Sequence, residues 1–267
     1  MRIGLGILLA AFMSVPRISA AQTSGPPALP RVYVDVNLFG YADLLGDAKT
    51  FQNYAIKFGE VATFTATYPE PSHSAVYPLH VGGGFMLSRY YGVGASYSRL
   101  SRSSVVDLSA TVPDPTFFEA LATGRGTTGT ALSRHESAIH ISLAVVPLRT
   151  PRMEVRLIVG PSFYMLSGDM VREVEYAQTS SDVSPHNAIT VNGASTGAAK
   201  GSAVGYHLGG DFTYFVHRAV GIAGGIRYGR ATVAVNSEPL SNLKQEFLVG
   251  GTTVFLGLRF RFGPNHE

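Results

Sequence analysis

Seven charged residues lie in segments where polar and apolar side chains alternate along the chain. An extended chain with this period of two places its polar residues on one face and its aliphatic residues on the other. Charges of both signs on the inner face of a closed sheet can line a selective pore, or they can pair and fill the interior. The seven residues are Asp35, Glu154, Arg156, Asp211, Arg227, Arg259 and Arg261.

We expect a packed interior, because eight strands enclose only enough space for side chains and unpaired buried charge is costly. Pairing of two neighbouring segments near the C-terminus would place Arg227 roughly opposite His207. Closure of the last strand on the first would bring Arg259 or Arg261 near Asp35. Together with the other inward charges, these residues form a predicted lumen charge network.

Three histidines, His80, His140 and His207, fall on the same polar faces, together with Glu136 and Asp211. A metal site would need three or four such ligands to converge within about 2 Å of one ion. No two histidines have the HxH or HxxxH spacing that would help to bring them together. We therefore expect these side chains to hydrogen-bond within the interior, and we expect no metal and no cofactor.

The tripeptide His135-Glu136-Ser137 is the only local cluster that contains the residue types of a hydrolytic site. It matches no recognisable catalytic motif, and a nucleophilic triad usually assembles from distant segments. A lipid-modifying enzyme is therefore a minor alternative, and we expect no catalytic residues.

The alternation itself predicts the elements that position these residues. In the closing stretch, for example, Leu256 and Leu258 alternate with Gly257 and Arg259. The same pattern predicts eight strands, joined in strict alternation by short turns and long connections. The predicted strands span residues 31–39, 79–88, 91–100, 134–146, 153–165, 204–215, 220–233 and 247–262.

The long connections, 41–77, 101–133, 168–202 and 236–245, are predicted as loops. Within the first, residues 60–68 are β-prone, and we interpret them as a strand extension beyond the membrane, because single-chain bacterial barrels have even strand numbers. Inward charges argue against a soluble lipocalin-like barrel, whose interior is apolar. The pattern predicts an all-β, eight-stranded antiparallel up-and-down transmembrane β-barrel with short periplasmic turns and long external loops.

Residues 1–21 have the charged start, apolar stretch and small residues of a cleaved secretory signal, and the apolar run is too short to span a membrane. Its removal takes away two arginines, so the formal net charge of +3 falls by two and gives no indication of nucleic-acid binding. The absence of cysteine excludes disulfides and thiolate chemistry. We expect a flexible lead-in at 22–30, the barrel at 31–262 and a tail at 263–267.

The Gly- and aromatic-rich hairpin 81–98 and the closing strand resemble those of the small OmpA/OmpX-like outer-membrane β-barrels, the porin family or outer membrane protein β-barrel domain group. Gly257, Phe260 and Phe262 are similar to the C-terminal signal that the barrel assembly machinery reads in such proteins, although here five residues follow the last aromatic. The resemblance implies insertion by that machinery after escort by periplasmic chaperones. It implies no single activity.

Aromatic residues near the short turns, Tyr90, Tyr91, Tyr214 and Phe215, are predicted to form an interfacial girdle that sets the depth of the barrel in lipid. In the second long connection, Phe117 and Phe118 are candidates for an exposed partner contact or for packing between loops.

We expect a monomeric, non-enzymatic outer-membrane barrel that contacts lipid and has an envelope-structural role or a surface-interaction role through its external loops. The alternative is a narrow channel for small solutes or a conduit for apolar ligands.

Overall fold

The computed structural model describes residues 31–44, 49–69, 79–180, 187–235 and 245–263, so the predicted signal peptide and lead-in lie outside the described residues. Every regular element in this part is a β-strand, and no described helix is long and apolar enough to cross a membrane. The strands are β1 (Val32–Leu44), β2 (Lys49–Lys57), β3 (Glu60–Tyr68), β4 (Leu79–Met86), β5 (Tyr91–Ser104), β6 (Asp107–Pro113), β7 (Leu121–Thr127), β8 (Leu132–Arg149), β9 (Met153–Ser180), β10 (Asn187–Phe215), β11 (Val220–Val235) and β12 (Gln245–Phe262).

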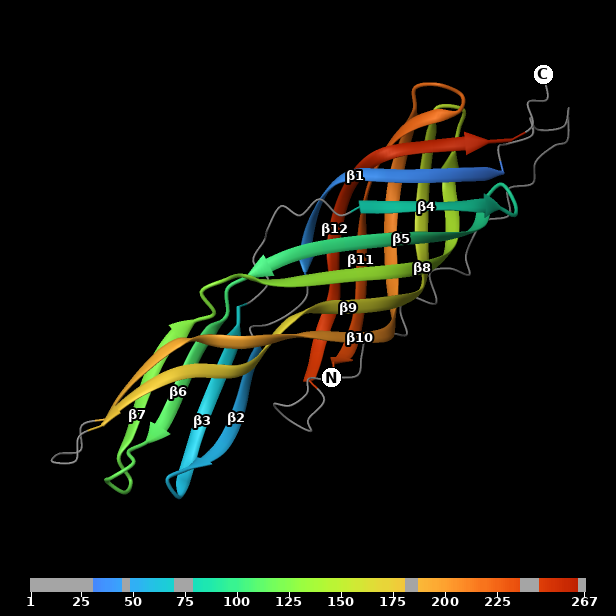
Figure 1. Cartoon of the computed structure of the whole chain (residues 1–267). Coiled ribbons are helices and arrows are strands. Elements are labelled where there is room, and N and C mark those ends of the chain that lie inside the picture. The colour runs from blue at the N-terminus through green and yellow to red at the C-terminus, as the bar shows by residue number, and fades with distance from the viewer. Residues whose placement is uncertain (1–30, 45–48, 70–78, 181–186, 236–244, 264–267) are drawn as a thin grey trace, which may run out of the picture.

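Eight of these strands form a closed antiparallel barrel in the order β1-β4-β5-β8-β9-β10-β11-β12 (Figure 1). The ring closes at β1, where Val32 lies opposite Phe262 of β12 on one side and opposite Phe85 of β4 on the other. The prediction of an eight-stranded up-and-down barrel is confirmed. The short turns and both ends of the barrel lie at one rim, which is the periplasmic rim in barrels of this construction.

The other four strands form a second sheet in the order β2-β3-β6-β7. The prediction of loops at 41–77 and 101–133 is therefore wrong, because each stretch contributes one hairpin to this sheet. β3 coincides with the β-prone stretch 60–68, but it belongs to the separate sheet and does not extend a spanning strand.

The prediction of a loop at 168–202 is also wrong, because β9 and β10 continue beyond the barrel as one long hairpin. Their pairing runs from Met153 opposite Tyr214 to Ser180 opposite Asn187, with two register shifts. The Gly-, Ser- and Thr-rich composition gives little hydrophobic alternation, although main-chain pairing does not require it.

We call the second sheet, together with the outer halves of β9 and β10, the external module. It lies end to end with the barrel on the side of the long connections (Figure 1). β7 lies so close to β10 that a side chain at Gly124 would collide with the main chain of Ile189. The two layers enclose an apolar core formed by Ala62, Ala66, Val106, Leu108, Ala110, Val112, Leu132, Val171 and Val174.

The barrel carries its aliphatic side chains on the outside and its charges inside. This arrangement is the reverse of a soluble barrel and suits strands that face lipid on one side. The outward residues include Ile139, Ile141, Leu143, Leu157, Val159, Phe163, Leu208, Phe212, Ile222, Ile226, Val254 and Leu256, all of which are exposed.

Candidate functional site

Near the periplasmic rim, arginines and carboxylates form a buried ion-pair network inside the barrel. Arg259, which is 1% exposed, lies at its centre. Its Nε lies 2.6 Å from Oδ1 of Asp35, its Nη1 3.0 Å from Oε1 of Glu154, and its Nη2 2.7 Å from Oδ1 of Asp211. Arg156 bridges the same two aspartates, with Nη2 2.7 Å from Asp35 and 2.8 Å from Asp211. Each charge in this network therefore has partners of the opposite sign.

Arg261 does not join this network, although the sequence analysis grouped it there. Its guanidinium donates to the carbonyl oxygens of Arg218 at 2.6 Å and Pro151 at 2.7 Å, and it lies 3.7 Å above the ring of Phe215. Phe215 is only 3% exposed, so its predicted place in the aromatic girdle is wrong. The alternation of β10 turns Phe215 inward where it turns Tyr214 outward.

Farther along the interior, two histidines and three serines form a hydrogen-bonded chain. His140 contacts Ser98 at 3.0 Å and Ser162 at 2.7 Å, and His207 contacts Ser162 at 2.8 Å and Ser142 at 2.9 Å. Within the described ranges, no group of three histidine, aspartate or glutamate side chains is placed to hold a metal ion. The hydrogen-bonded chain of histidines and serines links four neighbouring strands, β5, β8, β9 and β10, along the inner wall of the barrel.

Arg227 does not lie opposite His207, contrary to the sequence prediction. The ladder between β10 and β11 places His207 opposite Gly229 and Arg227 opposite Gly209, which is a shift of two residues. Nη1 of Arg227 instead lies 2.6 Å from Nε2 of His80, a residue of β4.

Two ion pairs and a set of apolar side chains narrow the external mouth of the barrel. Glu136 lies 2.7 Å from Arg134 and 3.6 Å from Arg102. The apolar cluster beside it was not predicted, because the sequence analysis assigned only polar residues to the interior. It comprises Ala138, Tyr164, Leu166, Met170, Ala199, Ala231, Val233, Val235, Phe247 and Val249.

These layers leave little free volume inside the barrel. A pocket of about 160 Å³ lies at the external mouth beside Arg134 and Phe247. Below it, a cavity of about 80 Å³ lies between His140, Tyr164 and Arg227, and another of about 20 Å³ lies beside Tyr33 and Asp35. Among the described residues, the interior is therefore a succession of packed layers with separate cavities between them.

The tripeptide His135-Glu136-Ser137 does not converge on one point. Glu136 is buried in the interior, whereas the flanking His135 and Ser137 lie on the other face of β8, as strand alternation requires. His135 contacts Ser101 at 2.8 Å and Ser137 contacts Tyr97 at 3.2 Å. The three side chains therefore cannot act on a common substrate atom in the manner of a triad.

The remaining predicted aromatic residues lie at the surface near the short turns. Tyr90, Tyr91, Tyr214 and Phe262 are exposed, and Phe260 is partly exposed. Gly257 is buried, so the three residues of the candidate assembly signal do not share one face.

Phe118 lies at the far tip of the external module, where it is 77% exposed, while Phe117 beside it is partly buried. The tips of the two hairpins meet there, because the main-chain N–H of Glu119 donates to Oε1 of Glu60 at 3.0 Å. Further apolar residues are exposed at the same tip, namely Ile56, Phe58, Val61 and Leu121.

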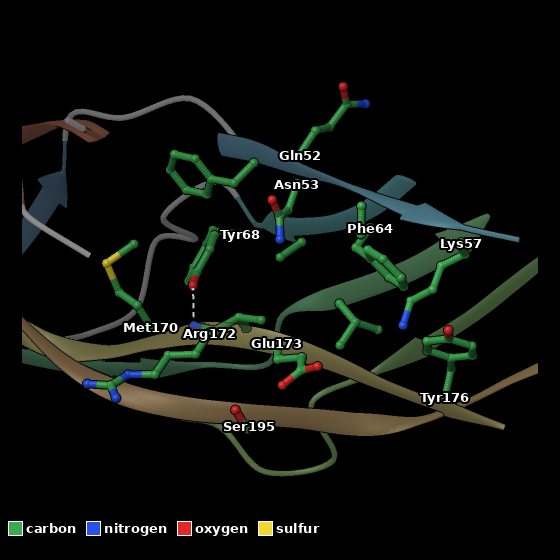
Figure 2. Close-up of a pocket in the computed structure, with 15 residues that line it drawn as sticks. Gln52, Asn53, Lys57, Phe64, Tyr68, Met170, Arg172, Glu173, Tyr176 and Ser195 are labelled. Atoms are coloured by element: carbon green, nitrogen blue, oxygen red, sulfur yellow. Dashed lines mark hydrogen bonds between the residues drawn. The ribbon is translucent and has the colours of Figure 1, made fainter. Parts of the chain in front are cut away.

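The external module also contains a cleft of about 420 Å³, which we call the external cleft (Figure 2). It lies between β2 and β9 over the face of β3, where the ring of Phe64 and the hydroxyl of Tyr68 point into it. Burial raises the pKa of Tyr68, against the opposite effect of the hydrogen bond that its oxygen accepts from Val171. The sequence analysis missed this site, and the β-prone stretch 60–68 was its one recognisable signal.

No protein-family model and no curated protein matches this chain. Solved structures that resemble it include the outer membrane protein OprG from Pseudomonas aeruginosa, at 8% identity and a TM-score of 0.45 over 89% of this chain and 99% of that one. The outer membrane protease OmpT from Escherichia coli has 9% identity and a TM-score of 0.45 over 90% and 99%. The attachment invasion locus protein Ail of Yersinia pestis has 10% identity and a TM-score of 0.41 over 88% and 100%.

The closed ring of eight strands, the outward aliphatic band and the ionic interior define a transmembrane β-barrel of the outer-membrane class. The protein lies in the outer membrane, with its external module beyond the lipid. This assignment rests on the strand order and burial pattern of the chain itself.

Proposed function

We propose that this protein is a non-enzymatic, monomeric outer-membrane barrel that does not conduct and that presents the external module for surface interactions. The observation that carries the proposal is the contrast between its two ends. The barrel interior holds paired charges and apolar side chains, whereas the module holds a cleft of about 420 Å³, against about 160 Å³ for the pocket at the barrel mouth and about 80 Å³ for the larger cavity below it.

Support for a non-enzymatic role comes from the only local cluster of hydrolytic residue types, whose side chains point to opposite faces of β8. Support for membrane insertion through the usual biogenesis route comes from the exposed aromatic end of β12, with the barrel assembly machinery and periplasmic chaperones as partners. Outer-membrane lipid is the partner of the aliphatic band.

Planar-bilayer recording of the purified barrel tests the proposal. We expect no discrete conductance steps at any voltage, because buried side chains pack across the described interior around Arg259 and His207. Stable unitary currents would contradict the proposal and favour the narrow channel for small solutes. An empty bilayer treated with detergent and an open porin provide the negative and positive controls.

A further inference from the structure

The walls and the floor of the external cleft are made by different parts of its strands. β3 contributes alternate residues, Phe64, Ala66 and Tyr68, as a strand does when it presents one face. β2 contributes residues 51–53 together with Ala55 and Lys57, and β9 contributes residues 170–174 together with Tyr176. The alternate residues of β2 share its inner face, whereas the intervening Gln52 and the unbroken run in β9 border the cleft with the edges of these strands. The cleft therefore lies above the face of β3 and reaches the edges of β2 and β9.

The edge of β2 that borders the cleft carries main-chain groups that pair with none of the described strands. β2 and β3 are joined by the two-residue turn Phe58-Gly59, whose φ angles of 53° and 84° are those of a tight hairpin that pairs Lys57 with Glu60. Hydrogen-bonded and non-hydrogen-bonded pairs alternate along an antiparallel ladder. Because Lys57 and Glu60 form a hydrogen-bonded pair, Ile56 and Tyr54 direct their N–H and C=O groups away from β3. In agreement, the N–H of Tyr54 donates to the side chain of its own neighbour Asn53, at 3.0 Å.

Beyond Gly168, the facing edge of β9 also pairs with none of the described strands. The ladder between β8 and β9 ends where Arg134 lies opposite Gly168, while the ladder between β9 and β10 continues outward. Beyond this point, the N–H of Val171 points away from β10 and donates to the hydroxyl of Tyr68 at 2.8 Å (Figure 2). On each edge, a side chain of the cleft therefore accepts a hydrogen bond from a main-chain N–H that has no strand partner: Asn53 from Tyr54, and Tyr68 from Val171.

We propose that the external cleft binds an extended peptide segment of a partner protein, which adds as a strand to the edge of β2 opposite β9. This inference rests on the proposed surface-interaction function and specifies its ligand. Alternating main-chain donors and acceptors on a strand edge are complementary to an extended peptide, and strand addition of this kind supplies affinity through the main chain. On the other side of the module, β7 already lies against β10, so the added strand fills the remaining opening.

The cleft also defines the side chains that the peptide should carry. Residues of an added strand point alternately to the floor and to solvent, so every second residue faces the aromatic rings of Phe51, Phe64 and Tyr68. Lys57 on the β2 wall and Glu173 on the β9 wall provide charges of opposite sign. We expect alternating apolar or aromatic residues, with an acidic residue toward Lys57 and a basic residue toward Glu173.

The edge of β2 is long enough for this role and lacks two of the usual protections. Natural edge strands are blunted by proline, by bulges or by charged side chains. β2 is nine residues long, contains no proline and pairs with β3 without a register shift, and its two lysines, Lys49 and Lys57, stand at its two ends.

The test uses the full barrel in lipid nanodiscs and a phage-displayed library of linear heptapeptides. Selected peptides are synthesised, and their binding to three forms of the protein is measured by fluorescence anisotropy. Tyr54→Pro removes the free-edge N–H without removing a hydrogen bond to β3, whereas the matched control Tyr54→Thr removes the side chain and keeps the N–H. We expect alternating sequences to be enriched, with binding weakened about tenfold or more by Tyr54→Pro and little changed by Tyr54→Thr.

A second measurement does not depend on the folding of a variant. Methylation of alternate main-chain nitrogens on the face of the peptide that pairs with β2 should abolish binding to the unmodified protein, and methylation of the other set should not. Equal binding to Tyr54→Pro and Tyr54→Thr, equal tolerance of both methylation patterns, or failure to enrich alternating sequences would overturn the inference. If any of these results is obtained and the bilayer recording shows no conductance, the proposal of a non-conducting barrel still holds and only the proposal of a peptide site fails.

Discussion

Arg259 places a single positive charge among three carboxylates in a space that excludes bulk water. Its contacts to Asp35, Glu154 and Asp211 lie between 2.6 and 3.0 Å. Burial of each charge costs several kcal/mol in lost hydration, so the network is stable only while every member keeps its partners. Removal of Arg259 costs more than the net stabilisation from any one ion pair, because it leaves three buried carboxylates to share two arginines, Arg156 and Arg149.

We predict that Arg259→Met lowers the free energy of unfolding by about 3–5 kcal/mol. The measurement is equilibrium unfolding in urea of the barrel in lipid vesicles, followed by tyrosine fluorescence. Arg125→Met on the exposed face of β7 is the matched control and should change it by less than about 0.5 kcal/mol. A loss for Arg259→Met no larger than that of the control would mean that water compensates the carboxylates, which contradicts a packed interior.

Among the strands, β4 and β5 provide space for the ring of Tyr33, which packs against the arginines of the ion-pair network. Tyr33 of β1 lies over Gly84 and Gly94, and the guanidinium of Arg156 lies 4.6 Å from its ring. A Cβ at Gly84 would collide with the ring of Tyr33 and with the main-chain oxygen of Val93, which cannot move without breaking the ladder. The glycines of this hairpin therefore serve the packing of the interior as well as the curvature of a small barrel.

We predict that Gly84→Ala lowers the free energy of unfolding by about 1–3 kcal/mol, because the added methyl group overfills the interior. Gly224→Ala is the matched control in β11, where a Cβ would make only ordinary contacts with Leu256 and the main chain. The same urea titration measures both variants. If the two substitutions have equal effects, loss of backbone freedom rather than collision with Tyr33 explains them.

At the scale of the molecule, the barrel and the external module share β9 and β10 but hold separate ladders. The barrel ladder is complete without any residue of β2, β3, β6 or β7. The module, in contrast, depends on the outer halves of β9 and β10 for one of its two layers. This arrangement makes the barrel a support that can form alone and the module an addition to it.

We predict that the barrel still closes when β2–β3, β6–β7 and the outer halves of β9 and β10 are all replaced by short Gly-Ser turns. The measurement is heat-modifiable gel migration, in which a closed barrel migrates differently before and after boiling. A control that deletes only the two hairpins should aggregate, because the apolar residues Val171, Val174, Ile189 and Val191 then lose their cover. Loss of the migration shift in the full deletion would show that the module is needed for closure.

The sequence analysis identified the spanning strands and the inward set of charges, but not every contact among those charges. Strand alternation assigns a side chain to a face, and Asp35, Arg156 and Arg259 lie where it predicted. It does not assign a depth, so the shift that pairs Arg227 with His80 rather than His207 could not be derived. Phe215 was assigned to the aromatic girdle because it lies near a turn, whereas the alternation of its strand places it in the interior, where it is buried.

The barrel could be predicted from the local sequence, because each spanning strand faces lipid on one side and a polar interior on the other, which produces a pattern of period two. The external module and its cleft could not be predicted in this way. Their strands have no lipid to face, and several are rich in Gly, Ser and Thr, so their pairing depends on contacts between residues far apart in the chain. The free edges of β2 and β9 become a site only because β3 holds them apart over one face.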